Sequence, residues 1–181
     1  MISRSEAVGF VGENLKNKNL IKHCLASEAV MRALAAHFGE NEEEWGLAGL
    51  LHDADVEITP AAEQGKTVGD MLAERIPPQM RHAMAAHNTV TGVVPESRFD
   101  HALTAGETIT GLIVASALVL QDKKLSSLTK ESIVKRFGEK RFAAGANRGL
   151  IMHCEKIGLT LEQFSEICLN AMKNISNELG L

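Results

Sequence analysis

The segment LLHDAD, residues 50–55, places one imidazole and two carboxylates directly after an apolar run. Imidazole and carboxylate both bind metal ions and transfer protons. Consecutive residues of a helix point roughly 100° apart, so His52 and Asp53 can share one ion only where their helix borders a cavity and other helices supply further ligands. The dipeptide alone leaves two interpretations open, a metal-assisted hydrolase centre or a polar helix end that is capped by acids.

Further candidate ligands lie in other segments of the chain. His23 stands among apolar neighbours in NLIKHCLASEAV, and Glu107 lies within ALTAGETITG. A site built from imidazoles and carboxylates is typical of a borderline or hard divalent ion, here Mn, Fe, Ni, Co, Zn or Mg. The sequence therefore offers a ligand set that neighbouring helices would have to bring together.

Two more side chains are candidates for proton transfer. His87 directly precedes Asn88 at a predicted helix end, so it either faces the cleft or makes a plain contact with the helix dipole. Asp55 follows His52 by three residues. If the helix continues that far, Asp55 lies near the same face and would orient a water molecule; otherwise it is a helix-terminal acid that faces solvent.

A basic run, KRFGEKRFAAGANR, is the candidate for holding a substrate phosphate. Its relevant residues are Arg136, Lys140 and Arg148. Guanidinium groups bind phosphate in a bidentate manner. The alternative is a solvated charged face between two helices.

The elements that would position these groups are all predicted to be helices. Apolar residues recur at helical spacing, and Ser3 with Glu6, Asn41 with Glu44, and Thr160 with Gln163 have the pattern of helix-capping boxes. No segment alternates apolar and polar residues as a strand would. The predicted helices cover residues 3–15, 19–38, 41–51, 67–74, 77–87, 99–120, 129–137, 148–157 and 160–179.

Composition limits the class of protein. A chain of 181 residues is most simply one domain. The net charge of −4 gives no support for a surface that coats nucleic acid. Three cysteines without CxxC spacing indicate neither a disulfide framework nor a thiolate zinc site, and the apolar run 109–120 is shorter than the roughly 20 residues of a spanning helix. We expect an all-α, single-domain protein of a reducing, cytoplasmic compartment, with no membrane partner.

The wider pattern resembles the HD-domain superfamily of metal-dependent phosphohydrolases, and in particular a small bacterial and archaeal branch of HDIG-type proteins. The resemblance covers residues 19–148. Its segments are NLIKHCLASEAVMRALA, WGLAGLLHDADVEIT, HAMAAHN, ALTAGETITGLIVASALV and KRFGEKRFAAGANR. It implies a helical bundle of the HD type, in which His23, His52 and Asp53 are metal ligands and Glu107 occupies the place of the usual aspartate.

Two positions depart from that family pattern. Glutamate at position 107 keeps the carboxylate but lengthens its arm by one methylene, so the site would shift, weaken or prefer another ion. In QGKTVG, Gly65 stands at about the place where relatives often carry a histidine. In two-metal members that histidine and the equivalent of His87 help to hold the second ion. Its absence favours a single-metal site, or leaves the centre impaired.

The leading hypothesis is hydrolysis of a small phosphorylated molecule, either a phosphate ester or a nucleotide. The alternative is a ligand-binding or regulatory domain of the HD type without turnover, and a di-iron oxygenase ranks last because it needs a fuller histidine set. The substrate, the native metal and the oligomeric state, including a homo-oligomer, stay open at this point.

Overall fold

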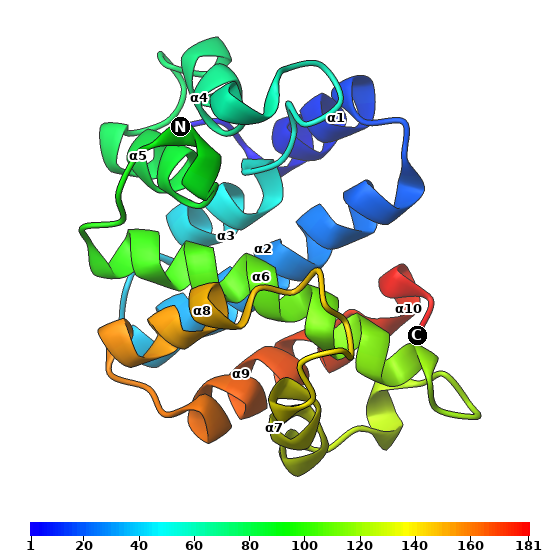
Figure 1. Ribbon diagram of the computed structural model, residues 1–181. Helices are drawn as coiled ribbons and strands as arrows, with labels where there is room; N and C mark the ends of the chain where they lie inside the picture. The colour runs from blue at the N-terminus through cyan, green and yellow to red at the C-terminus, as the bar shows by residue number, and fades with distance from the viewer.

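The computed structural model describes residues 1–181, and every regular element in it is a helix, which confirms the predicted all-α class. The α-helices are α1 (Arg4–Asn14), α2 (Lys18–Phe38), α3 (Glu42–Leu51), α4 (Lys66–Met71), α5 (Pro78–Ala86), α6 (Arg98–Leu118), α7 (Lys130–Gly138), α8 (Arg148–Ile151), α9 (Leu161–Asn174) and α10 (Ser176–Leu179) (Figure 1). Short 3-10 helices lie at Ala61–Glu63, Thr89–Thr91, Leu125–Ser127 and Met152–Ile157. No helix has the length and apolar character needed to cross a membrane.

Helix ends follow the predicted capping residues. Complete capping boxes start α1 at Ser3 and α9 at Thr160. The side chain of Asn41 accepts hydrogen bonds from two backbone N–H groups of the first turn of α3. Gly39 ends α2 in the left-handed conformation, with a φ of 68°, which glycine adopts without strain. These local signals therefore set the ends of the first three helices.

Two predicted helices are interrupted. Residues 148–157 form one α-helical turn, Arg148–Ile151, which continues as a 3-10 helix. The predicted helix 160–179 ends at Asn174, because Ile175 leaves the helical region with a φ of −114°, and the short α10 follows. Both interruptions lie outside the segments that carry the candidate ligands.

The interior of the protein is one cluster of buried apolar side chains, to which all of the long helices contribute. Helix α6 runs through the middle of the molecule, and α2 packs against α3, α6 and α9 (Figure 1). Most residues of α6 are buried, as its central position requires. The two longest helices, α2 and α6, therefore form the framework to which the others are attached.

The close contact between α2 and α3 depends on Gly49. A Cβ atom at this position would lie 2.5 Å from the backbone oxygen of Ser27, a distance that real side chains do not tolerate. Ser27 lies one turn after His23 on α2, and Gly49 lies just under one turn before His52. The close approach of the two backbones therefore brings these two imidazoles together.

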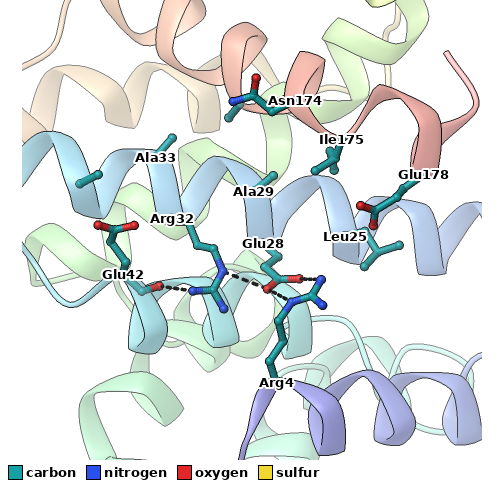
Figure 2. Close-up of a pocket in the computed structure, with 12 residues that line it drawn as sticks. Arg4, Leu25, Glu28, Ala29, Arg32, Ala33, Glu42, Asn174, Ile175 and Glu178 are labelled. Atoms are coloured by element: carbon teal, nitrogen blue, oxygen red, sulfur yellow. Dashed lines mark hydrogen bonds and ion pairs between the residues drawn. The ribbon is translucent and has the colours of Figure 1, made fainter.

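A buried carboxylate ties α1 to α2. Glu28 is 3% exposed, and its carboxylate accepts hydrogen bonds from Arg4 at 2.7 and 3.0 Å and from Arg32 at 3.0 Å. Figure 2 shows the two guanidinium groups on either side of Glu28, beside a cavity of about 320 Å³. A buried charge is tolerated when it is paired and hydrogen-bonded in this way. This cluster involves none of the candidate ligands and is structural.

Candidate metal centre

Five titratable side chains from four parts of the chain meet beside α6. They are His23 of α2, His52 and Asp53 directly after α3, His87 directly after α5, and Glu107 of α6. The structure thus brings together all four ligands that the sequence predicted, and His87 lies with them.

The distances describe two overlapping groups of possible ligand atoms. Nε2 of His23 lies 3.2 Å from Nε2 of His52, 3.7 Å from Oδ2 of Asp53 and 3.6 Å from Oε2 of Glu107. Nε2 of His52 lies 3.6 Å from Oδ2 of Asp53, and Nε2 of His87 lies 3.3 Å from Oδ1 of Asp53. In each group of three, His23–His52–Glu107 and His52–Asp53–His87, the ligand atoms lie within 4.8 Å of one another.

The ring orientation of His23 is fixed by Thr110. The hydroxyl of Thr110 donates to the backbone oxygen of Glu107 at 2.6 Å, so its oxygen is left to accept a hydrogen bond from Nδ1 of His23 at 3.0 Å. With the proton on Nδ1, a neutral His23 carries its lone pair on Nε2. That lone pair faces His52 and the two carboxylates.

The other two imidazoles are held in the same tautomer by backbone oxygens. Nδ1 of His52 donates to the oxygen of Gly49 at 2.8 Å, and Nδ1 of His87 donates to that of Met84 at 2.5 Å. Metal-binding histidines commonly donate their second ring N–H to a fixed acceptor in this way. Neutral His23 and His52 therefore present Nε2 lone pairs to each other, whereas Nε2 of His87 faces Oδ1 of Asp53.

Lone pairs that face each other at 3.2 Å repel unless a proton or a metal ion lies between them. The donor set around them, imidazole nitrogens and carboxylate oxygens without a thiolate, suits a borderline or hard divalent ion. The three cysteines are buried and unpaired, and none belongs to either group of possible ligand atoms. The residues present therefore fit a divalent metal ion.

Burial and charge set unusual pKa values for the groups of this cluster. Burial lowers the pKa of His52 to about 3, so its ring stays neutral at ordinary pH. Burial opposes ionisation of Asp53 as well, but the neighbouring His52 and His87 outweigh it and hold the pKa of that carboxyl well below its usual range. Burial likewise disfavours a charged His87, but its hydrogen bond and charge attraction with Asp53, together with Glu107 and the bond to Met84, outweigh burial and raise the pKa to about 8. The cluster thus combines a permanent carboxylate with a neutral imidazole.

Glu107 reaches the cluster despite its longer arm. Its Oε2 faces His23, and the hydroxyl of Thr108 donates to its Oε1. Burial raises the pKa of the Glu107 carboxyl. The substitution of glutamate for the aspartate of the family pattern therefore leaves a carboxylate oxygen within reach of the imidazoles.

The backbone at Gly65 does not accept a histidine. Its φ of +80° is one that residues with a side chain rarely adopt. A Cβ atom there would lie 2.0 Å from the backbone oxygen of Met84. The backbone at this position is therefore built for glycine, and no side chain reaches the cluster from it.

Asp55 does not lie among the candidate ligands. Helix α3 ends at Leu51, and Asp55 falls in the turns that follow. Its fully buried carboxylate accepts hydrogen bonds from the backbone N–H groups of Gly65 and Val68, at 2.9 to 3.1 Å. We therefore assign Asp55 to holding the first turn of α4, in place of the catalytic role predicted for it.

Arg148 binds the loop rather than presenting its charge to a ligand. Its guanidinium donates to six backbone oxygens, those of Arg136, Phe137, Glu139, Phe142, Ala143 and Ala146. A guanidinium has five N–H donors, and all of them are occupied here. The predicted phosphate contact is thus replaced by a structural role for Arg148.

The other two predicted phosphate ligands differ from each other. Arg136 pairs with Glu139 at 2.8 Å and lies over the ring of Phe142. Lys140 is exposed, makes no ion pair, and lines a cavity with Gly145 and Asn147. Of the three predicted residues, Lys140 alone retains a free charge.

A cavity of about 420 Å³ gives access to the cluster. It is bordered by His23 and Glu107 on one side and by the loop of residues 143–147 on the other. The loop comes from the basic segment named in the sequence, but it borders the cavity with small residues and Asn147. The segment therefore borders the cavity, but the three basic residues predicted to hold a phosphate do not line it.

Sequence reasoning missed the residues that orient the ligands. Thr110 lies three residues after Glu107, so it shares a helix face with that ligand, and this spacing was the available signal. Gly49 was a second available signal, since a glycine within a helix usually has a packing role.

Comparisons with protein-family models, with curated proteins and with solved structures find no match.

Proposed function

We propose that the protein is a metal-dependent phosphohydrolase of the HD type, which cleaves a phosphate ester or a nucleotide. One divalent ion would be held by His23, His52, Asp53 and Glu107. The observation that carries the proposal is the convergence of imidazole Nε2 lone pairs and two carboxylates on one small volume, with each ring held by a fixed acceptor at Nδ1. The resemblance of residues 19–148 to the HD pattern supports it independently.

A bound divalent ion supplies Lewis acidity towards a phosphoryl oxygen and towards water. The chain's own groups prepare the site for it. Asp53 stays ionised, and His52 stays neutral because it is buried. His87, with its raised pKa, holds a proton at Nε2 that faces Oδ1 of Asp53 and keeps Oδ2 directed towards His23 and His52. That proton is also a source for the departing oxygen of an ester.

The cavity beneath residues 143–147 is the proposed place for the substrate phosphate. Its volume of about 420 Å³ lies at the lower end of ligand pockets, which are typically about 300–1,000 Å³. The neighbouring cavity that Lys140 lines shares Gly145 and Asn147 with it. Lys140 therefore supplies a free positive charge in the cavity beside the proposed phosphate site.

The proposal is tested by measuring metal content and turnover together. Purified protein is stripped and reloaded separately with Mn, Fe, Ni, Co, Zn and Mg, and each form is assayed for phosphate release from nucleoside monophosphates and aryl phosphates. His52→Gln and Asp53→Asn are expected to lose both the bound ion and turnover. The control is His37→Gln, because His37 is an exposed histidine in the last turn of α2. Undiminished turnover in both site variants would overturn the proposal.

A second candidate function is a ligand-binding or regulatory domain of the HD type without turnover. The backbone at Gly65, which excludes a histidine, favours it, because the two-metal form of the site lacks one of its ligands. Calorimetry distinguishes the two candidates. Tight binding of a nucleotide without phosphate release under any of the six ions supports this second function, whereas metal-dependent release of phosphate eliminates it.

A further inference from the structure

Gly111 lies in the interior of α6 without a packing reason. A glycine within a helix costs about 1 kcal/mol relative to alanine. The glycine at position 106 of the same helix is explained by packing, because a Cβ atom there would lie 3.1 Å from Val30. A Cβ atom at Gly111 would meet no atom within 4 Å, and the residue is exposed. The space above Gly111 is therefore open.

That open space joins two cavities. Gly111 follows Glu107 by one helical turn and lines the cavity of about 420 Å³ at the candidate metal centre. It also lines a second cavity of about 410 Å³ between α2, α6 and α10. His23 is the other residue that lines both cavities. The two cavities therefore meet at His23 and Gly111.

The walls of the second cavity are largely apolar. Ala26 of α2, Val114 and Leu118 of α6, and Leu179 of α10 line it. The ammonium group of Lys22, the one cation in its wall, donates to the backbone oxygen of Leu179 at 2.7 Å. Apolar surface favours an apolar guest. The second cavity therefore suits the organic part of a substrate better than its phosphate.

We infer that Gly111 determines substrate specificity by keeping open the passage from the metal centre to the apolar cavity. The inferred substrate is a phosphate ester whose organic group is apolar and of the size of an aromatic ring or a short alkyl chain. The phosphate lies at the cluster, and the organic group passes over Gly111 to contact Val114 and Leu118. This inference rests on the proposed function for the identity of the reacting group.

Binding of non-hydrolysable phosphonates tests the inference without relying on turnover. Calorimetry on the protein loaded with Mn²⁺ compares methylphosphonate with benzylphosphonate, octylphosphonate and a nucleoside 5′-phosphonate. A single methylene in a hydrophobic pocket is worth roughly 10- to 200-fold in discrimination, so a larger apolar group gives at least a measurable preference. The wild-type protein is expected to bind benzylphosphonate or octylphosphonate about tenfold or more tightly than methylphosphonate, and tightest binding of the nucleoside 5′-phosphonate would contradict the apolar assignment.

The variant Gly111→Leu, whose Cβ would meet no atom within 4 Å, places an isobutyl group in the passage and is expected to abolish that preference. Its control is Gly12→Leu, because Gly12 is an exposed glycine of α1 whose added Cβ also meets nothing within 4 Å. Leucine favours the helix over glycine by roughly 1 kcal/mol, so Gly111→Leu is expected to unfold no earlier than wild type. Equal affinity of the wild-type protein for all four phosphonates, or an unchanged preference in Gly111→Leu, would overturn the inference.

The experiments distinguish a failure of the inference about Gly111 from a failure of the proposed function. If no ester is hydrolysed under any ion but the phosphonate preference is present and is lost in Gly111→Leu, the hydrolase proposal fails and the specificity role of Gly111 stands. If esters are hydrolysed with metal dependence but without preference for the larger organic group, the hydrolase proposal stands and the inference about Gly111 fails.

Discussion

Removal of the Asp55 carboxylate separates its assigned structural role from a catalytic one. Its two oxygens accept from two backbone N–H donors, those of Gly65 and Val68, in a fully buried environment. Asp55→Ala leaves both donors without an acceptor, and each unsatisfied buried donor costs about 1–3 kcal/mol. Burial raises the pKa of the Asp55 carboxyl despite these bonds, so loss of the buried charge returns part of that cost. We expect a net decrease of about 2–3 kcal/mol in the free energy of unfolding.

Asp55→Asn is the matched variant. Oδ2 alone accepts from both donors, at 2.9 Å each, so one amide oxygen in that place keeps both satisfied. We therefore expect Asp55→Asn to cost less than about 1 kcal/mol. Urea unfolding followed by far-ultraviolet circular dichroism measures both variants, and bound metal and turnover are measured on the same samples.

Two results would refute this reasoning. The first is an unfolding free energy of Asp55→Ala equal to that of the wild type. The second is an Asp55→Asn protein that retains stability and bound metal but loses turnover, since that pattern belongs to a residue that acts on the substrate or on water.

Three further predictions concern the surroundings of the site. Gly65→His is expected to lower the free energy of unfolding by at least about 2 kcal/mol, because of the positive φ and the clash with the backbone oxygen of Met84. It is also expected to add no second bound ion, and a second ion found by metal analysis would contradict this. Arg148→Lys is expected to expose residues 137–147 to limited proteolysis, since lysine has three donors for six carbonyl oxygens, and cleavage at the wild-type rate would refute the clamp. In metal-free protein, the pKa of His87 is raised from 6.5 to about 8, so its stabilising contribution is complete below pH 6.5 and is lost as the pH rises through 8. At about 1.36 kcal/mol per unit of pKa shift, the free energy of unfolding falls by on the order of 2 kcal/mol over this range. Urea unfolding of His87→Gln at the same pH values should not show this decrease.

Much of the fold was accessible from the sequence because the signals are local. Capping residues and apolar periodicity placed the long helices, and Pro78 placed the start of α5. The sequence left open whether the helix continues to Asp55, because this depends on the hydrogen bond by which Asp55 holds the start of α4. That bond joins residues that are 13 apart, and periodicity carries no information about it.

The candidate site was likewise predictable from the sequence only in part. His23, His52, Asp53 and Glu107 were identified by residue type and by resemblance, and the structure brings them together. The role of Arg148 was not accessible, since six backbone oxygens from a folded loop occupy its guanidinium. Charge alone does not reveal whether a guanidinium is already satisfied within the protein.

The second pair of facing imidazoles gives the central claim an internal comparison. Nδ1 of His101 lies 3.1 Å from Nδ1 of His153, but no carboxylate or third histidine completes a ligand group around them. A histidine pair that binds metal nonspecifically would take up an ion as readily here as at His23 and His52.

Anomalous diffraction from crystals soaked in Zn²⁺ therefore tests the account most directly. It predicts one strong peak per chain, at about 2.0–2.2 Å from Nε2 of His23, Nε2 of His52 and an oxygen of Asp53. The same peak should disappear in Asp53→Asn. An absence of any peak at this cluster, or a peak of equal strength between His101 and His153, would contradict the account.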